Sequence, residues 1–198
     1  MSRNRWGAVA VALAAAATPA PAKNTALPYR VVIASTWGDG AGSDAFRIDL
    51  QRALADAFGR GCFTEVVVVE DDPAQAAGDL LLALYLSDAI EEIRFDDTIA
   101  GALMPGEPGK ELRRQAFFQV SVDARLTSRA DLAPVESKAL VAAISRRPMV
   151  LGEDPQASAR QLAIERIVND LSKTFCRSTD KLARKIKAAM PAETAPPR

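Results

Sequence analysis

The 198-residue sequence contains no histidine. Because imidazole is the usual partner of a serine or cysteine nucleophile, this absence excludes Ser-His and Cys-His pairs. It also excludes imidazole acid-base chemistry and any metal site held by histidine. Gly-x-Ser-x-Gly does not occur. We therefore expect no enzymatic activity, no catalytic residues, and no bound metal or cofactor.

A net charge and long apolar segments are also lacking. The chain has 25 Lys and Arg against 25 Asp and Glu, so its charge gives no argument for nucleic acid as a partner. No apolar run approaches the roughly 20 residues that span a bilayer as a helix. With 48% hydrophobic residues, the chain can bury a core of its own as one domain.

The first 22 residues have the layout of a secretory signal peptide. Arg3 and Arg5 precede the apolar run 8–17, and Ala20-Pro21-Ala22 fits the small-x-small cleavage rule. We expect cleavage before Lys23, which leaves 23 basic and 25 acidic residues and a net charge of −2. No cysteine follows the apolar run to accept a lipid. The sequence predicts a periplasmic or secreted protein without a lipid anchor or a later membrane span.

Strand and helix patterns alternate along the rest of the chain. We expect strands over 29–35, 63–70, 79–86, 118–126 and 137–145, and helices over 44–58 and 155–175. The runs 63–70 and 79–86 are apolar on both faces, which is typical of central strands, although the leucine run also fits a short buried helix. Ser43 and Asp154 are expected to cap the two helices.

The order β-α-β-β-β-β-α predicts an α/β two-layer sandwich, with a mixed sheet and both main helices on one face. We expect a linker over 23–28, a single domain over 29–176, and a basic segment with a disordered tail over 177–198. The connection 96–115 is long for a hairpin, so we interpret it as mobile or functional.

Cys62 and Cys176 are the only cysteines. Each follows one of the predicted helices, and parallel helices on one sheet face place their C-terminal ends side by side. An exported protein meets an oxidising compartment. We therefore predict a disulfide between them, with two separate buried thiols as the alternative.

A glycine-rich segment joins the first strand to the first helix, a position at which phosphates can bind. Its spacing matches neither Gly-x-Gly-x-x-Gly nor a nucleotide-binding loop. We interpret it as a flexible turn and helix cap, with contact to a ligand or a protein partner as the competing hypothesis. The residues concerned are Trp37, Gly38, Asp39, Gly40 and Gly42.

Charges are unevenly distributed. Ten acidic residues and one basic residue lie between Glu65 and Asp97, which leaves a calcium site as an alternative although no EF-hand loop is present. The C-terminal segment is basic, with apolar residues at helical spacing, and is represented by Lys181, Arg184, Lys185 and Lys187. It fits a membrane contact, an acidic partner, packing on its own domain, or a solvated helix extension.

The order of elements resembles the small α/β domains of bacterial envelope proteins: the amino-terminal domain of the Tol-system translocation protein, the curli-secretion lipoprotein and the penicillin-binding-protein activators. The resemblance covers about residues 29–176. It rests on the strand Tyr29 to Ser35, the helix with Phe46, Leu50, Leu54 and Phe58, the strands to Leu86 and the late helix Ala159 to Phe175. It implies a non-enzymatic binding or assembly role in the envelope.

The sequence thus predicts an exported protein-binding module with an envelope protein as its partner. Strand addition at an exposed sheet edge is the expected mechanism. A small-ligand or Ca²⁺-binding module is the alternative, and a hydrolase a further one.

Overall fold

The computed structural model describes residues 26–38, 42–69, 73, 76–95, 106 and 113–190. The strands are β1 Leu27–Trp37, β2 Phe63–Val69, β3 Leu80–Phe95, β4 Arg114–Ser128 and β5 Pro134–Arg146. The helices are α1 Asp44–Gly61, α3 Pro155–Phe175 and α4 Thr179–Ala189. The predicted order β-α-β-β-β-β-α is confirmed, and α4 follows it. The predicted signal peptide and the last eight residues lie outside the described residues.

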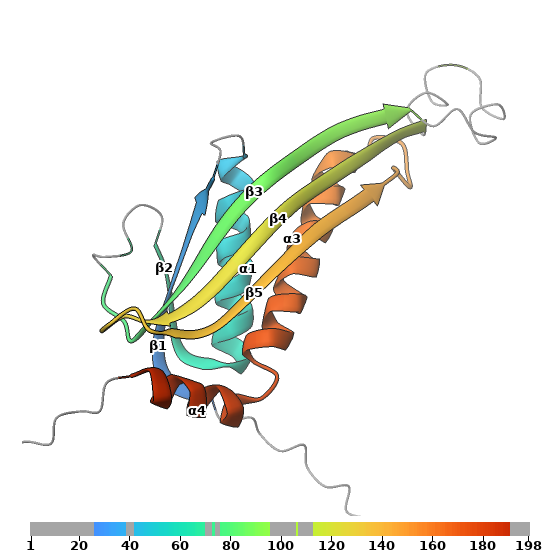
Figure 1. Ribbon diagram of the computed structural model, residues 1–198. Helices are drawn as coiled ribbons and strands as arrows, with labels where there is room; N and C mark the ends of the chain where they lie inside the picture. The colour runs from blue at the N-terminus through green and yellow to red at the C-terminus, as the bar shows by residue number, and fades with distance from the viewer. Residues whose placement is uncertain are drawn as a thin grey trace, which may run out of the picture.

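The five strands form one mixed sheet in the order β2-β1-β3-β4-β5 (Figure 1). β1 is parallel to both of its neighbours, β2 and β3. β3, β4 and β5 follow one another as antiparallel neighbours. Two crossover connections therefore build the parallel part: α1 connects β1 to β2, and a second connection leads from β2 past β1 to β3. From β3 to β5 the chain forms an antiparallel meander.

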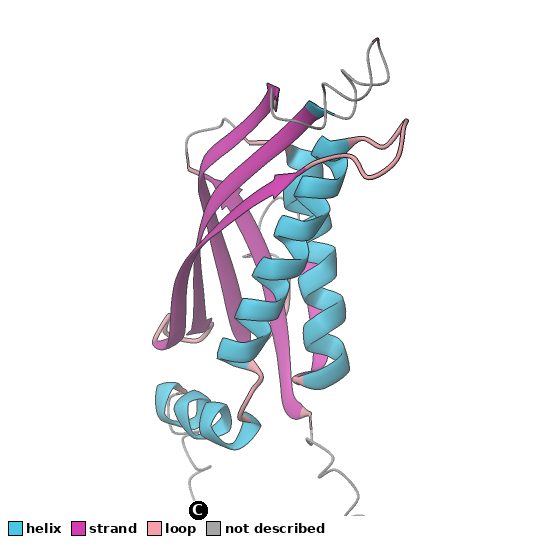
Figure 2. Ribbon diagram, turned by 90° about the vertical axis from the view of Figure 1, so that its right-hand side faces the viewer, coloured by secondary structure: helices cyan, strands magenta, loops and turns pink. Residues whose placement is uncertain are grey.

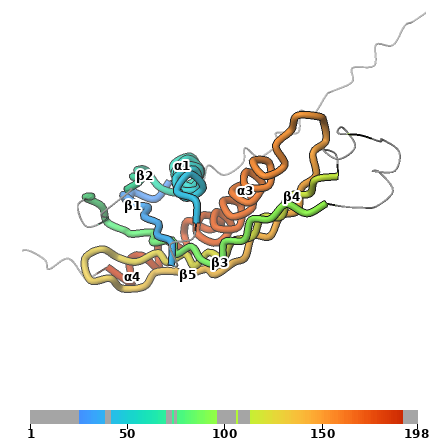
Figure 3. Tube along the Cα trace, turned by 90° about the horizontal axis from the view of Figure 1, so that it is seen from above, coloured from blue at the N-terminus to red at the C-terminus, as the bar shows by residue number. Residues whose placement is uncertain are grey.

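Both main helices cover the same face of this sheet, as Figures 2 and 3 show from two directions. α1 lies over β1 and β2, while α3 lies over β4 and β5 and also contacts α1. The core between the layers takes alternate residues of β3, Leu80, Leu82, Leu84 and Leu86, all at most 1% exposed. Alternation along a strand sends every second side chain to one face. The predicted two-layer sandwich is confirmed.

The two helix starts differ from each other. Asp154 accepts a hydrogen bond from the backbone N–H of Gln156 at 2.9 Å, with Pro155 in the first turn, as predicted. Ser43 occupies the corresponding position before α1, but its hydroxyl makes no capping hydrogen bond. There the carboxylate of Asp44 interacts instead with Arg47, one turn further along the helix.

The interpretation of 63–70 as a central strand is wrong, because β2 is an edge strand. Its valines are only partly buried, since no strand lies beyond them. Near its start, Glu65 pairs with Arg30 of β1 at 3.2 Å. The leucine run is a strand rather than a helix, and it continues to Phe95, well beyond the predicted end.

The antiparallel strands are longer than the helices beside them and curve away from α1 as an arm (Figure 1). At the end of this arm, Phe95 of β3 lies opposite Arg114 of β4, and Arg146 of β5 lies opposite Ala116. Residues 147–154 lead from there back into α3. We call this the distal end.

At the opposite end of the molecule, α4 lies across the sandwich (Figures 1 and 2). It contacts β5 and β4, and its Leu182 and Ile186 belong to the buried core. Of the interpretations of the basic segment, packing on its own domain is the one observed for these residues. The folded domain therefore extends past residue 176 to Ala189.

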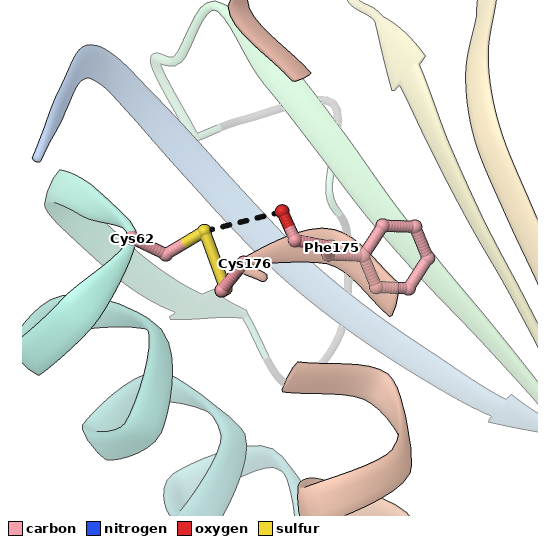
Figure 4. Close-up of a disulfide and its surroundings, with 3 residues drawn as sticks. All are labelled: Cys62, Phe175 and Cys176. Atoms are coloured by element: carbon pink, nitrogen blue, oxygen red, sulfur yellow. Dashed lines mark hydrogen bonds between the residues drawn. A yellow bond between two sulfur atoms is a disulfide. The ribbon is translucent and has the colours of Figure 1, made fainter. Parts of the chain in front are cut away.

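A disulfide joins Cys62 to Cys176, as predicted (Figure 4). α1 and α3 run parallel, and the Cα atoms of the two cysteines at their ends are 5.1 Å apart. The Cys62 sulfur also lies 3.4 Å from the carbonyl oxygen of Phe175 (dashed line in Figure 4). Because a disulfide sulfur has no proton, this is a close polar contact and not a donated hydrogen bond.

An aromatic cluster surrounds the bridge. The ring of Phe58 in α1 lies 6.0 Å from that of Phe63 and 6.2 Å from that of Phe175, centroid to centroid. All three side chains are at most 1% exposed. Tilted ring pairs at this separation add to the stabilisation from burial. The ends of the two helices are thus held by a covalent bond and by packing together.

Replacement of both cysteines by serine (C62S/C176S) is expected to lower the free energy of unfolding by about 2–5 kcal/mol, because the bridge constrains a long loop in the unfolded chain. Urea titration of the oxidised protein measures it. Wild-type protein in excess dithiothreitol is the control and should match the variant. Equal unfolding midpoints with and without reductant would contradict the prediction.

Candidate binding surfaces

The glycine-rich segment follows β1 and is partly folded back onto the domain. The ring of Trp37 packs against Phe46 of α1, with centroids 6.3 Å apart, and lies directly over Gly42. Gly38 lies against the ring of Tyr85, so a side chain at either glycine would collide with an aromatic ring. Trp37 therefore covers the start of α1. Asp39 and Gly40 lie outside the described residues, and a partner contact of this segment stays a prediction.

Among the described residues, the face of the sheet without helices carries the exposed large side chains Tyr85 and Ile90 of β3 and Val141 of β5. Asp123 of β4, opposite Tyr85, accepts hydrogen bonds from the guanidinium of Arg125 at 2.6 and 3.0 Å. The hydrogen bond and the negative charge of this carboxylate raise the pKa of Arg125 further above its ordinary value. Tyr85, Asp123 and Arg125 border a shallow hollow of about 430 Å³.

Both sheet edges are partly covered by side chains from the helices. Gln51 of α1 donates to the carbonyl of Val69 in β2 at 3.2 Å. Arg166 of α3 approaches the carbonyl of Ala143 in β5 at 3.4 Å. Each edge strand thus has one carbonyl contacted by a helix side chain.

Three of the five described acidic residues of the acidic stretch, Glu65, Glu91 and Glu92, pair with arginines. Glu92 pairs with Arg94 at 2.7 Å, and Glu91 reaches Arg160 of α3 at 2.6 Å. Among the described residues, no group of three or more potential ligand side chains lies together. No observation on these residues favours the calcium alternative.

The four basic residues singled out in the C-terminal segment fall into two groups on α4. Lys181 and Lys185 face a hollow between α3 and α4, and Lys185 also pairs with Glu136 of β5. Arg184 and Lys187 do not line this hollow. The side chain of Arg184 instead reaches the carbonyl of Asp180 at 3.4 Å.

The distal end carries an apolar surface that the sequence analysis missed. Met149, Val150 and Leu151, in the connection from β5 to α3, are 73%, 64% and 57% exposed, and Phe95 at the end of β3 is 65% exposed. We call these four residues the apolar tip. The sequence feature that could have revealed this surface is the apolar run Met149-Val150-Leu151, which lies directly before Gly152 and outside every predicted strand or helix.

Hydrogen bonds hold the connection in a defined shape. The N–H of Glu153 donates to the carbonyl of Val150 at 3.3 Å, and Gly152 has φ +84°, as a type II turn requires. The Glu153 carboxylate accepts the N–H of Met149 at 2.7 Å and the hydroxyl of Ser158 at 2.9 Å. These bonds lower the pKa of Glu153 below its ordinary value. The apolar tip is therefore presented by a braced loop.

No helix in the described part of the chain is long and apolar enough to cross a membrane. No protein-family model matches the sequence, and no curated protein matches it. Comparison with solved structures does find proteins of similar fold.

Among solved structures, a putative neuraminyllactose-binding hemagglutinin homolog from Helicobacter pylori is similar, with a TM-score of 0.52 at 11% identity over 86% of this chain and 95% of that chain. A DUF330-family protein from Xanthomonas campestris matches with a TM-score of 0.45 at 14% identity, covering 86% and 94%. A minor lipoprotein from Acinetobacter baumannii matches with a TM-score of 0.40 at 11% identity, covering 77% and 94%.

At these identities the likeness concerns the fold alone. The chain is an α/β sandwich whose fold is similar to that of the Helicobacter pylori protein. This likeness identifies no specific family.

Substitution of Gly42 by alanine is expected to lower the free energy of unfolding by about 1–3 kcal/mol, because the new methyl group would enter the space of the Trp37 ring. The matched control is Gly61→Ala, where nothing lies within 4 Å of the added carbon. That variant should keep or slightly gain stability, since alanine favours helix over glycine. In protein cleaved before Lys23, Trp37 is the sole tryptophan, and its fluorescence follows both transitions. Identical behaviour of the two variants would refute the packing role.

Acidification should release the brace of the distal loop. Because the folded protein holds the pKa of Glu153 below its ordinary value of 4.5, the carboxylate stabilises the loop above that pH and loses this effect as the pH falls through its lowered pKa. An NMR titration of the Met149 amide should therefore show a midpoint below 4.5. In the Glu153→Gln variant this transition should be absent. A midpoint at or above 4.5 in the wild type would argue against the brace.

Proposed function

We propose that the protein is an exported, non-enzymatic accessory protein of the bacterial envelope that binds another protein through the apolar tip. The observation that carries the proposal is the joint exposure of Phe95, Met149, Val150 and Leu151 at one end of the molecule. Apolar side chains that are exposed singly are common on protein surfaces, whereas a group of them marks an interaction site.

The build of the loop supports a binding role. Glu153 fixes the backbone of Met149, so little conformational entropy remains to be lost on binding. Arg146, which pairs with Glu153 at 3.4 Å, and Arg114 lie beside the apolar residues. An apolar centre with a polar rim is the usual make-up of a protein interface.

The position of the tip supports the same interpretation. The connection 96–115, expected from its length to be mobile or functional, leaves β3 at Phe95 and enters β4 at Arg114, both at the distal end. The apolar tip thus lies at the end of the sheet where β3 ends and β4 begins. A partner bound there would leave α4 and the disulfide region accessible.

The proposed location rests on separate features. The signal-peptide pattern of residues 1–22 predicts export, and a disulfide persists in the periplasm or outside the cell. Structures with a similar fold include a bacterial lipoprotein. This chain has no cysteine after its apolar leader, so we propose a periplasmic or secreted protein without a lipid anchor.

A photo-crosslinking amino acid at position 150, introduced into the full chain in the source bacterium, tests the proposal. The control position is Leu132, which is 67% exposed in the turn between β4 and β5, at the other end of β4. We expect a discrete protein adduct from position 150 and not from position 132.

The variant M149D/L151D, combined with the probe at position 150, should reduce this adduct at least about tenfold, because each buried apolar side chain contributes about 1.5–3 kcal/mol. Its unfolding midpoint should stay unchanged, since both side chains are exposed. The same adducts from positions 150 and 132, or adducts with lipid alone, would refute a protein-binding tip.

A further inference from the structure

A hollow of about 280 Å³ lies where α3 passes into α4, at the end of the molecule opposite the apolar tip. Side chains from three elements face it: the end of α3, the start of α4, and β5. The charged and hydroxyl-bearing ones used in the argument are Lys173, Arg177, Ser178, Lys181, Lys185 and Glu136.

The charge around this hollow is strongly unbalanced. Four of its side chains are basic, and Glu136 is its single acid. Glu136 is engaged by Lys185, and Lys173 pairs with Asp170 of α3 at 3.9 Å. Among the residues that the structure describes, no ion pair is formed by Arg177 or Lys181. Cations placed around one hollow repel each other, so an anion between them would lower the electrostatic energy.

The fold holds these cations in place. Arg177 directly follows Cys176, which the disulfide ties to the end of α1. Lys181 and Lys185 are four residues apart on α4 and therefore share one face of that helix. Leu182 is buried in the core, and this anchors the helix beside the hollow. The site is therefore largely formed before any ligand arrives.

The start of α4 adds hydrogen-bond donors. Ser178 occupies the position before the helix and lines the hollow, and its hydroxyl makes no capping hydrogen bond. The hydroxyl is thus left to donate to a ligand. The N-terminus of a helix carries a partial positive charge, which here adds to the charge of the lysines.

We propose that this hollow binds a phosphate group, as part of a soluble phosphate ester or of a phosphorylated lipid headgroup. A phosphate monoester carries up to two negative charges, and its oxygens can accept from the guanidinium fork of Arg177 and from Lys181 together. A lone carboxylate would leave most of the positive charge uncompensated. The site is independent of the proposed partner at the apolar tip, and both can be occupied at once.

Isothermal titration of the oxidised, processed protein with inorganic pyrophosphate, at constant ionic strength in chloride, is the primary test. R177Q/K181Q removes two cations of the hollow, whereas R184Q/K187Q removes two cations that do not line it. We expect R177Q/K181Q to bind at least about tenfold more weakly, from the loss of charge-assisted hydrogen bonds. The matched variant should bind within about twofold of the wild type, because only screened long-range charge is lost.

The unfolding midpoints of both variants should equal that of the wild type, since the four substituted side chains are exposed. Equal weakening by the two variants would show general attraction to a basic helix and would overturn the proposal. Acetate binding as tightly as pyrophosphate would overturn the assignment to phosphate.

Vesicle sedimentation distinguishes the two sources of phosphate. Phosphatidylcholine vesicles containing phosphatidic acid should sediment the wild type but not R177Q/K181Q if the ligand is a lipid headgroup. Binding of pyrophosphate without binding of these vesicles identifies a soluble phosphate ester. Absence of binding to both probes overturns the proposal.

Discussion

Two parallel helices end side by side on the sheet, and the Cys62–Cys176 bridge with its phenylalanine cluster holds those ends together. This junction fixes more than the helices. It also fixes where α4 can begin, because the chain turns into α4 directly after Cys176. The backbone N–H of Leu27, at the start of β1, donates to the carbonyl of Cys62 at 2.8 Å and ties the first strand to the same point. The cationic hollow between α3 and α4 lies directly beside this junction.

The opposite end of the molecule is organised differently. β3 and β4 continue beyond α1, so fewer layers cover their ends, and side chains there have less to pack against (Figure 1). At this end hydrogen bonds to Glu153 replace a hydrophobic core in ordering the loop. The two ends therefore offer different chemistry, apolar at the tip and cationic beside α4. These two surfaces are the ones for which we propose a protein partner and a phosphate group, respectively.

Local pattern was enough to predict the order of elements, the mixed sheet and the side on which the helices lie. Helical spacing of apolar residues and the Asp154-Pro155 start are properties of short windows. The edge position of β2 was not predictable in this way, because four consecutive valines look alike in an edge strand and a central one. The docking of α4 depends on Leu182 and Ile186 finding the core. The cationic hollow brings Glu136 together with residues more than 35 positions later in the chain, which no short window of sequence reveals. The exposure of the apolar tip depends on which surfaces the other elements cover, and this too is not a local property.

The sequence separation of 114 across the bridge has a consequence for how the chain matures. In a chain that emerges N-terminus first, Cys62 has no possible partner until residue 176 has followed, by which time all five strands and both main helices are available. The first strand also has to wait, because β1 needs β3 as well as β2 as neighbours. Oxidation thus secures a fold that is nearly complete instead of starting it. With only two cysteines, a single chain has one way to pair them, so maturation requires an oxidant and no reshuffling of wrong disulfides.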